Sequence, residues 1–216
     1  FNTQHIQNLI TCSQDQYKQL KNLYDKKNIK YVNFPSLIND KISKGRNKVP
    51  ELSNIKNYIL FFGGVDYYKG VDILVNAYQQ IQQEITNPLV IAGKGLQFKG
   101  DNILDINRVI DDNELRDLFT KASIVVYPYR SITMSGVLSI AYYFKKNVIV
   151  SDLGFFLQNK SQHTFVFRSE DVKDLAKTLK QALEKPSDMW NAYDEIYSNK
   201  KMITDYLIFY NQSKNE

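Results

Sequence analysis

The stretch SIVVYPYRSITMSGVLSIAYYFKKNVIVS, residues Ser123–Ser151, decides the fold. It begins with an apolar run at Ser123–Pro128 and ends with another at Asn147–Ser151. Uninterrupted apolar runs of this length are typical of strands that are covered on both faces. Between them, the apolar segment Ser135–Phe144 predicts a buried helix. A strand, a helix and a second strand in this order predict a parallel β-α-β unit.

The same alternation continues on both sides of this unit. Further strands are predicted at Asn8–Ser13, Ile29–Val32, Tyr58–Gly63, Pro88–Gly93, Asn102–Asn107 and Thr164–Phe167. Helices are predicted at Gln14–Lys26, Val71–Ile85, Asp112–Ala122 and Val172–Leu183, and over the remaining residues, with Trp190 on an aromatic face. Asp111 or Asp112 is the expected N-cap of the helix at Asp112–Ala122. Ser169–Asp171 cap the helix at Val172–Leu183, and Pro186 stops it. The polar segment Phe34–Lys56 is predicted to be a linker or long loop. Together these elements predict an α/β fold with a Rossmann-like, doubly wound parallel sheet.

The composition excludes several classes of protein. The chain of 216 residues has one cysteine and two histidines, so an internal disulfide is impossible and a His/Cys metal site is not expected. The net charge is +5, but the lysines are scattered and form no basic block with interleaved aromatics, so we expect no nucleic acid partner. The densest basic cluster, Lys41, Lys44, Arg46 and Lys48, fits either a solvated loop or a contact with a membrane surface. A single cysteine fits a reducing compartment such as the cytoplasm.

Glycines, hydroxyls and cations follow four of the predicted strands. In order along the chain these residues are Gly63, Gly64 and Lys69; Gly93, Lys94 and Gly95; Asn107, Arg108 and Val109; and Arg130, Thr133, Ser135 and Gly136. In doubly wound sheets, ligands bind outside the carboxyl ends of the strands. The sequence therefore predicts an anion site at this edge of the sheet.

The joint Thr133–Gly136 has two interpretations. A helix that begins at Ser135 and Gly136 presents unpaired N–H groups and the positive end of its dipole, and small residues let a phosphate come close. Alternatively, Thr133 or Ser135 is only an N-cap and Gly136 allows tight packing. The other motifs at this edge favour the phosphate interpretation. Neither glycine loop is specific by itself, because Gly63–Gly70 is not a Walker A motif and Gly93–Gly95 fits a simple turn.

Four motifs, taken in order, resemble one family. They are ILFFGGVDYYKGVDILVNAY (Ile59–Tyr78), LVIAGKG (Leu89–Gly95), DDNELRDLFTKASIVVYPY (Asp111–Tyr129) and TMSGVLSIAYYFKKNVIVSDLGFFLQ (Thr133–Gln158). The series resembles the C-terminal, nucleotide-sugar-binding domain of GT-B glycosyltransferases of the GT4 type (group 1). The resemblance divides the chain into a remnant of the N-terminal domain at 1–40, a linker at 41–56, the Rossmann-like donor-binding domain at 57–185 and C-terminal helices at 186–216.

The resemblance implies roles for the residues at the sheet edge. Lys69 falls on the lysine that neutralises the donor diphosphate, and Ser135 and Gly136 fall where backbone amides hold the same phosphates. Gly63, Gly64 and Thr133 belong to the same diphosphate site. Asn107, Arg108 and Val109 fall on the loop that lines the nucleotide base, and Gly93, Lys94 and Gly95 flank the donor pocket. No catalytic residue is assigned.

The sequence departs from the family pattern at charged positions. Gly64 stands where the family has an arginine, and Ile132 and Ile140 stand where it has paired glutamates. The motif Gly-Gly-x-x-Glu is Gly154–Gln158 here. The glutamate-free form Thr-x-Ser-Gly resembles one branch of the family. Lys94, Arg108 and Arg130 are the candidates to replace the missing arginine, and Arg130 ranks first because it belongs to the Thr-Ser-Gly loop.

The resemblance implies a retaining, hexosyltransferase-like enzyme of polysaccharide biosynthesis in the cytoplasm or at the inner face of the membrane. Its donor would be a UDP- or GDP-sugar and its acceptor a surface glycan or a lipid-linked sugar, with no metal and no cofactor. The chain begins with Phe1 rather than Met, which suggests a fragment, and transfer would need the missing N-terminal acceptor domain or a partner chain. The alternative, favoured by the lost charges, is a non-catalytic nucleotide-sugar-binding or partner-binding module.

Overall fold

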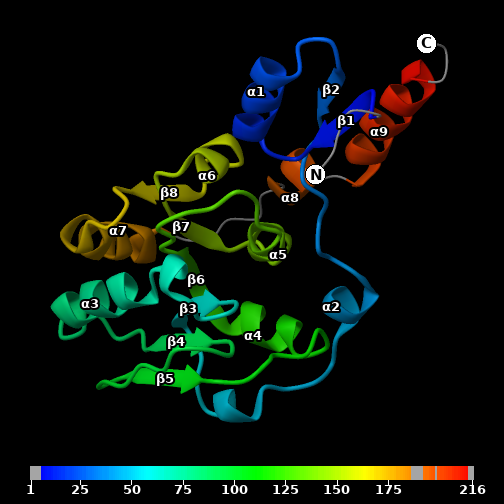
Figure 1. Cartoon of the computed structure of the whole chain (residues 1–216). Coiled ribbons are helices and arrows are strands. Elements are labelled where there is room, and N and C mark those ends of the chain that lie inside the picture. Colours follow the sequence, from blue (N-terminus) through cyan, green and yellow to red (C-terminus); the bar gives the residue numbers. More distant parts are fainter. Residues whose placement is uncertain (1–5, 186–191, 198, 214–216) are drawn as a thin grey trace.

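The computed structural model of the protein describes residues 6–185, 192–197 and 199–213, and six strands form its main sheet. These strands are β3 (Tyr58–Phe62), β4 (Leu89–Ala92), β5 (Ile103–Ile106), β6 (Ala122–Tyr127), β7 (Asn147–Ser151) and β8 (Thr164–Phe167). Every neighbouring pair is parallel, and the order across the sheet is β5-β4-β3-β6-β7-β8 (Figure 1). The predicted parallel sheet is therefore confirmed.

Helices cover both faces of this sheet. They are α3 (Val71–Ile81), α4 (Leu115–Lys121), α5 (Val137–Tyr143), α6 (Gly154–Gln158) and α7 (Val172–Glu184), with the short 3₁₀ turn η2 (Tyr67–Lys69) before α3. In Figure 1, α3 and α7 lie on one side of the strands and α4 and α5 on the other. The inner strands β3, β4, β6 and β7 are buried because both faces are covered, and β4 and β7 are buried along their whole length. This is the doubly wound arrangement that the alternation predicts.

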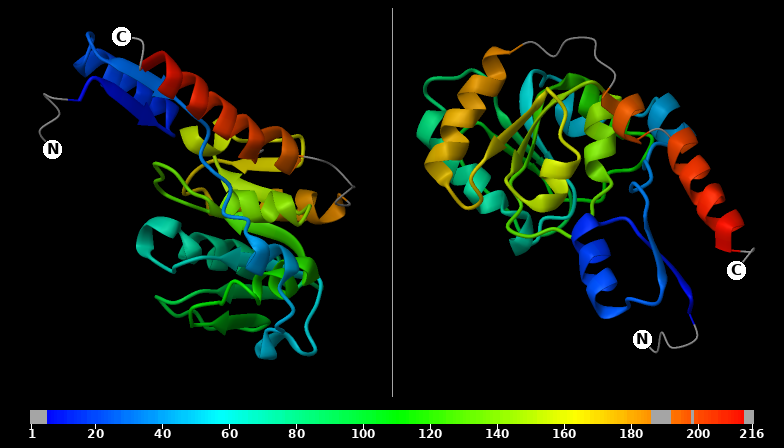
Figure 2. Two further views of the ribbon diagram at one scale, coloured as in Figure 1. Left: turned by 90° about the vertical axis from the view of Figure 1, so that its right-hand side faces the viewer. Right: turned by 90° about the horizontal axis from the view of Figure 1, so that it is seen from above.

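Residues 8–31 form a separate small unit. Strands β1 (Asn8–Thr11) and β2 (Asn28–Tyr31) pair in parallel, and α1 (Gln14–Leu23) connects them. The views in Figure 2 place this unit beside α9 (Asn199–Ser213), which follows the short helix α8 (Ala192–Tyr197). The strand predicted at Asn8–Ser13 ends two residues earlier, at Thr11. The reason is that the hydroxyl of Ser13 caps α1 by accepting a hydrogen bond from the Gln16 amide (3.3 Å).

The segment predicted as a linker contains regular structure. Helix α2 (Asp40–Lys44) and the 3₁₀ turn η1 (Pro50–Leu52) lie within it. Three of its apolar side chains are buried in the core: Ile42, Val49 and Leu52. The Asp117 carboxylate on α4 accepts hydrogen bonds from the Val49 amide (3.1 Å) and the Lys48 ammonium (3.0 Å). The polar composition concealed this packing, because only a few apolar residues in the segment carry it.

The predicted starts of α4 and α5 were wrong, α1 and α3 end three and four residues earlier than predicted, and two predictions fall outside the described residues. Helix α4 has Glu114 as its N-cap residue instead of Asp111 or Asp112, and the Glu114 carboxylate accepts a hydrogen bond from the Asp111 amide (2.9 Å). Helix α5 begins at Val137, two residues later than predicted. The predictions for Pro186 and Trp190 concern residues that the structure does not describe. Among the described helices, none is long and apolar enough to cross a membrane.

Candidate functional site

The loops that follow β3 and β6 lie side by side. Their strands are hydrogen-bonded neighbours at the position where the strand order reverses, which is where doubly wound sheets bind their ligands. The amide of Arg130 donates to the carbonyl of Tyr68 (2.8 Å). A side chain at Gly70, which has φ +66°, would overlap with the carbonyl oxygen of Pro128. The two loops therefore approach as closely as their backbones allow.

Lys69 lies in this junction, half-buried at the end of η2. Its ammonium donates a hydrogen bond to the Tyr129 hydroxyl (2.9 Å) and lies over the rings of Tyr129 (4.1 Å to the centroid) and Tyr68 (5.0 Å). Burial lowers its pKa, and the carboxylate of Asp66 only partly opposes this effect. Within the described part of the chain, no carboxylate forms an ion pair with Lys69. The junction thus holds a partly desolvated cation without a counter-ion.

A pocket of about 310 Å³ opens beside this cation. Its walls are Tyr68, Lys69, Tyr129, Ser131, Ile132, Thr133 and Met134. Burial raises the pKa of the Tyr129 hydroxyl, and the nearby side chain of Ser135 only partly opposes this shift. The fold therefore brings the predicted residues Lys69, Thr133 and Ser135 together around one tyrosine.

Gly63 and Gly64 leave room at the end of β3. Gly63 has φ +132°, a conformation that residues with a side chain rarely adopt, and a Cβ built there would meet no atom within 4 Å. At Gly64 a Cβ would meet only the Asp66 carboxylate, at 3.5 Å. A ligand can therefore approach this backbone closely, and no side chain replaces the missing arginine from within the loop itself.

Gly136 has a packing role that the sequence offered only as an alternative. A Cβ at this position would overlap with the side chain of Leu37, from the segment that precedes α2. The Ser139 hydroxyl holds that segment by accepting a hydrogen bond from the Leu37 amide (3.1 Å), and it donates to the Gly136 carbonyl (2.6 Å). Neither Thr133 nor Ser135 caps α5, whose N-cap residue is Gly136 itself. Tight packing is therefore confirmed, and the N-cap interpretation is wrong.

Arg130, the first candidate to replace the missing arginine, has partners of its own. Its guanidinium forms a bidentate pair with Asp72 (2.7 and 2.8 Å), donates to the Tyr67 carbonyl (2.8 Å) and lies over the Tyr67 ring (4.1 Å). A phosphate would have to compete with Asp72 for this side chain. The role of Arg130 as a direct diphosphate ligand stays a prediction.

The loop after β5 is held by similar contacts. The Arg108 guanidinium binds the carboxylates of Glu51 (2.8 and 3.0 Å) and Glu114 (2.8 and 2.7 Å) and lowers the pKa of both acids. The side chain of Asn107 pairs with the backbone of Gly95, and Val109 is 75% exposed. The backbone of this loop is thus fixed, whereas its cation, Arg108, is already neutralised.

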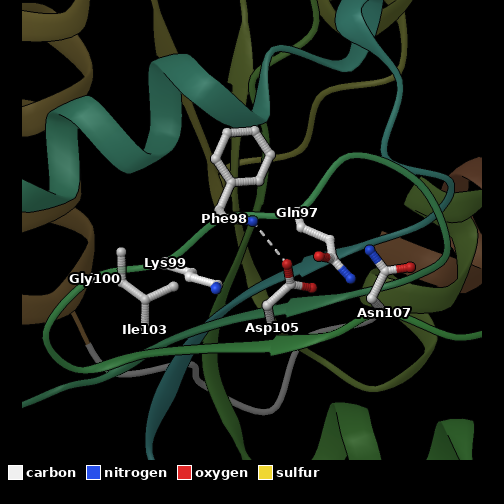
Figure 3. A pocket seen from close by; sticks show the side chains of 7 residues that line it. All are labelled: Gln97, Phe98, Lys99, Gly100, Ile103, Asp105 and Asn107. Atoms are coloured by element: carbon white, nitrogen blue, oxygen red, sulfur yellow. Dashed lines mark hydrogen bonds between the residues drawn. The ribbon is translucent and has the colours of Figure 1, made fainter.

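The glycines after β4 allow two loops to touch. A side chain at Gly93 would overlap with the carbonyl of Gly63, and one at Gly95 with the carbonyl of Val65. Lys94, between them, is exposed. Figure 3 shows a second pocket, of about 380 Å³, next to this loop at the edge strand β5, where the Asp105 carboxylate accepts from the Phe98 amide (2.8 Å). This pocket lies two strands away from the junction that holds Lys69.

Sequence reasoning missed three residues of the site. Tyr129 and Tyr68 surround the ammonium of Lys69, and Asp72 engages Arg130. The positions of the two tyrosines, directly after a predicted strand and directly before the lysine, were the available signal. Nothing local indicated Asp72, because its partner is 58 residues away in the chain.

Comparison with known families gives one match. Residues 56–185, more than half of the chain, match the model of the family described as glycosyl transferases group 1. A search of curated protein sequences found no match.

Several solved structures share the fold. The chain is similar to a sucrose-phosphate synthase from Thermosynechococcus elongatus (TM-score 0.74, 16% identity, 96% of this chain and 58% of that one). It is also similar to HepE from Anabaena in complex with UDP and glucose (TM-score 0.71, 15% identity, 97% and 63%). A third is a UDP-forming trehalose-phosphate synthase from Burkholderia xenovorans (TM-score 0.75, 11% identity, 97% and 61%). The chain spans about three fifths of the length of these structures.

Proposed function

Because the chain belongs to the group 1 glycosyl transferases, we propose that it is the donor-binding part of a retaining glycosyltransferase. Its donor is a nucleotide-diphosphate sugar, with UDP or GDP as the nucleotide, and its acceptor is a surface glycan or a lipid-linked sugar. UDP is the better supported nucleotide, because the similar HepE structure contains it. The enzyme would be of the hexosyltransferase kind and work in the cytoplasm or at the inner membrane face.

The observation that carries the proposal is the uncompensated cation at the junction of β3 and β6. Lys69 is partly desolvated, and no carboxylate among the described residues pairs with it. A buried charge without a partner is costly, and an anionic ligand removes that cost. The diphosphate would lie against Lys69, with Gly63 and Gly64 on one side and Thr133, Ser135 and Gly136 on the other. The nucleoside would extend over Gly93–Gly95 towards Asn107–Val109.

In this proposal these residues stabilise charge and form no covalent bond with the donor. In a retaining transfer, the acceptor hydroxyl attacks the sugar on the face from which the diphosphate leaves. Negative charge grows on the departing phosphate oxygen as the bond to the sugar breaks. Lys69 would stabilise that charge inside a pocket where water screens it poorly, and fixed charges of this kind lower the barrier most. In this proposal neither a metal nor a cofactor takes part.

Calorimetry with UDP, GDP and UMP tests this assignment. We expect diphosphates to bind more tightly than UMP. We expect Lys69→Ala to cost about 1.5–3 kcal/mol, the range for a hydrogen bond to a charged group, which is a tenfold to hundredfold loss. Lys56→Ala, which removes an exposed lysine away from the junction, is the matched control and should bind like the wild type. Equal affinity for UMP and UDP, or an unchanged Lys69→Ala protein, would refute the diphosphate site.

A second candidate function is a non-catalytic nucleotide-sugar-binding or partner-binding module. Two observations favour it: Gly64 carries no charge, and Ile140, at the position of a family glutamate, is buried in the core (2% exposed). Turnover separates the two functions. A module binds UDP-sugar or GDP-sugar and releases it intact, whereas the donor-binding part of an enzyme hydrolyses it slowly or transfers the sugar when an acceptor domain is supplied.

A further inference from the structure

Arg130 connects the two loops of the junction through its side chain and its backbone. The side chain is 14% exposed and binds the Asp72 carboxylate with both terminal nitrogens. One of these nitrogens also donates to the Tyr67 carbonyl. The backbone amide of Arg130 donates to the next carbonyl, that of Tyr68. The carboxylate of Glu170 lies 3.7 Å from the remaining nitrogen, Nε.

These contacts surround the short turn that carries Lys69. Two consecutive carbonyls of the turn accept hydrogen bonds from one residue of the facing loop, and Asp72 follows three residues after Lys69 in the first turn of α3. The Arg130 guanidinium also covers the exposed ring of Tyr67. The backbone of Lys69 is therefore fixed from both sides, and the ammonium is directed to Tyr129.

The same contacts direct Arg130 away from an anion. Its two terminal nitrogens already face a carboxylate at 2.7 and 2.8 Å, the distances of a strong charge-assisted pair. A phosphate would have to break this bidentate pair before it could bind. Arg130 can support diphosphate binding without that cost only by acting through another residue.

We propose that Arg130 and Asp72 form a positioning pair that holds the Lys69 turn against the loop 131–136, and that Arg130 does not bind the diphosphate itself. The inference rests on the proposed donor site, since it explains how a chain without the family arginine keeps Lys69 in place. It replaces the expectation that Arg130 takes over the role of the arginine missing at Gly64.

Hydrogen exchange of the ligand-free protein tests the positioning directly. In Arg130→Ala and in Asp72→Ala, the peptide that covers residues 65–70 should exchange faster than in the wild type. Arg168→Ala is the matched control, because it removes an exposed arginine from an ion pair with Asp171 (3.0 Å) outside the junction. Unchanged exchange at 65–70 in both variants would overturn the proposal. Because no ligand is present, this result is independent of the donor-site assignment.

Affinity for UDP separates positioning from direct binding. If Arg130 acts through Lys69, the double variant Lys69→Ala/Arg130→Ala loses no more affinity than Lys69→Ala alone. Asp72→Asn then weakens UDP binding, by about tenfold if the coupling resembles that of other contacting residues. If Arg130 were a ligand, the two losses would add, and Asp72→Asn would release the guanidinium and tighten binding.

Two further affinity measurements test the positioning role: UDP binding by Arg130→Lys, and UMP binding by the variants. Lysine keeps one donor for Asp72, so it should restore part of the UDP affinity that Arg130→Ala loses. UMP affinity should change less than UDP affinity, because a merely unstable protein would lose both equally. Additive losses, tighter binding by Asp72→Asn or equal losses for UMP and UDP would each overturn the positioning role. Failure of the wild type to bind any diphosphate, with exchange at 65–70 still faster in the variants, would instead reject the donor site.

Discussion

Lys69 combines two properties that rarely occur together at a surface. It is partly desolvated, and its neighbours are the aromatic side chains of Tyr68 and Tyr129 instead of carboxylates. Aromatic faces attract a cation without neutralising it, so the positive charge stays available to a ligand. An ion pair in the same place would have lowered both the cost of burial and the attraction for an anion.

The affinity for UDP should therefore depend on pH. Burial lowers the pKa of Lys69 in the free protein, and a bound diphosphate raises it again, because an opposite charge favours the protonated form. Affinity should be full below the pKa of the free protein and fall as pH rises through it, with proton uptake on binding between the two pKa values. Calorimetry in buffers with different ionisation enthalpies measures that uptake. In Lys69→Met the uptake should be absent, and uptake of equal size in this variant would contradict the assignment.

Helix α5 and the segment before α2 illustrate how elements constrain one another. The N-cap residue of α5 is a glycine because Leu37 occupies the space of a side chain there, and Ser139 on the same helix binds the Leu37 amide. The small residue thus serves contact between two protein segments, whatever ligand lies nearby. This contact fixes the first turn of α5 relative to the N-terminal part of the chain.

Gly136→Ala should accordingly lower the free energy of unfolding, whatever its effect on ligand affinity. Overpacking of a well-filled site costs about 1–3 kcal/mol, and the added methyl group would press on Leu37. Urea denaturation measures the loss. In the double variant with Leu37→Ala, the methyl group gains room, so the combined loss should be smaller than the sum of the two single losses. Strict additivity would show that Leu37 is not what excludes a side chain at Gly136.

On the scale of the whole molecule, the described residues form one complete sheet and one small sheet. The main sheet carries the candidate donor site, whereas β1 and β2 form a pair of strands with α1 between them. The similar solved structures are longer, since this chain spans 58% of the sucrose-phosphate synthase and 63% of HepE. A pair of strands offers little surface for an acceptor.

The 216-residue chain alone should therefore bind the donor but transfer nothing. We expect slow hydrolysis of a UDP- or GDP-sugar at best, because the described residues outside the main sheet offer little surface that could hold an acceptor or exclude water. Chromatographic detection of the free sugar and of any glycosylated acceptor measures both reactions. Hydrolysis should fall in Lys69→Ala and persist in Lys56→Ala. Efficient transfer by the purified chain would show that the terminal elements hold an acceptor site.

Much of the fold followed from local patterns. The apolar runs at β3, β4, β6 and β7 predict strands covered on both faces, and their alternation with helices predicts a parallel sheet with its ligand at the carboxyl ends. Lys69, Thr133 and Ser135 could be nominated in the same way, because position after a strand is a property of the sequence. Helix α2 could not be predicted from local pattern, because the burial of its segment depends on a few apolar residues that meet α4 and the core.

The sequence by itself thus determined the order along the chain of the strands in the main sheet and of most helices, the family, and the edge of the sheet where a ligand site is expected. Only the tertiary structure decided which cations remain available there. Arg130 and Arg108 look equivalent to Lys69 in the sequence, yet carboxylates 58 and 57 residues away neutralise them. Position 136 likewise has room only for a glycine, because a leucine from a distant segment occupies the space of a side chain. The reason is physical: backbone pattern depends on neighbours in the chain, whereas the free charge and free space at a site depend on whichever distant residues fill them.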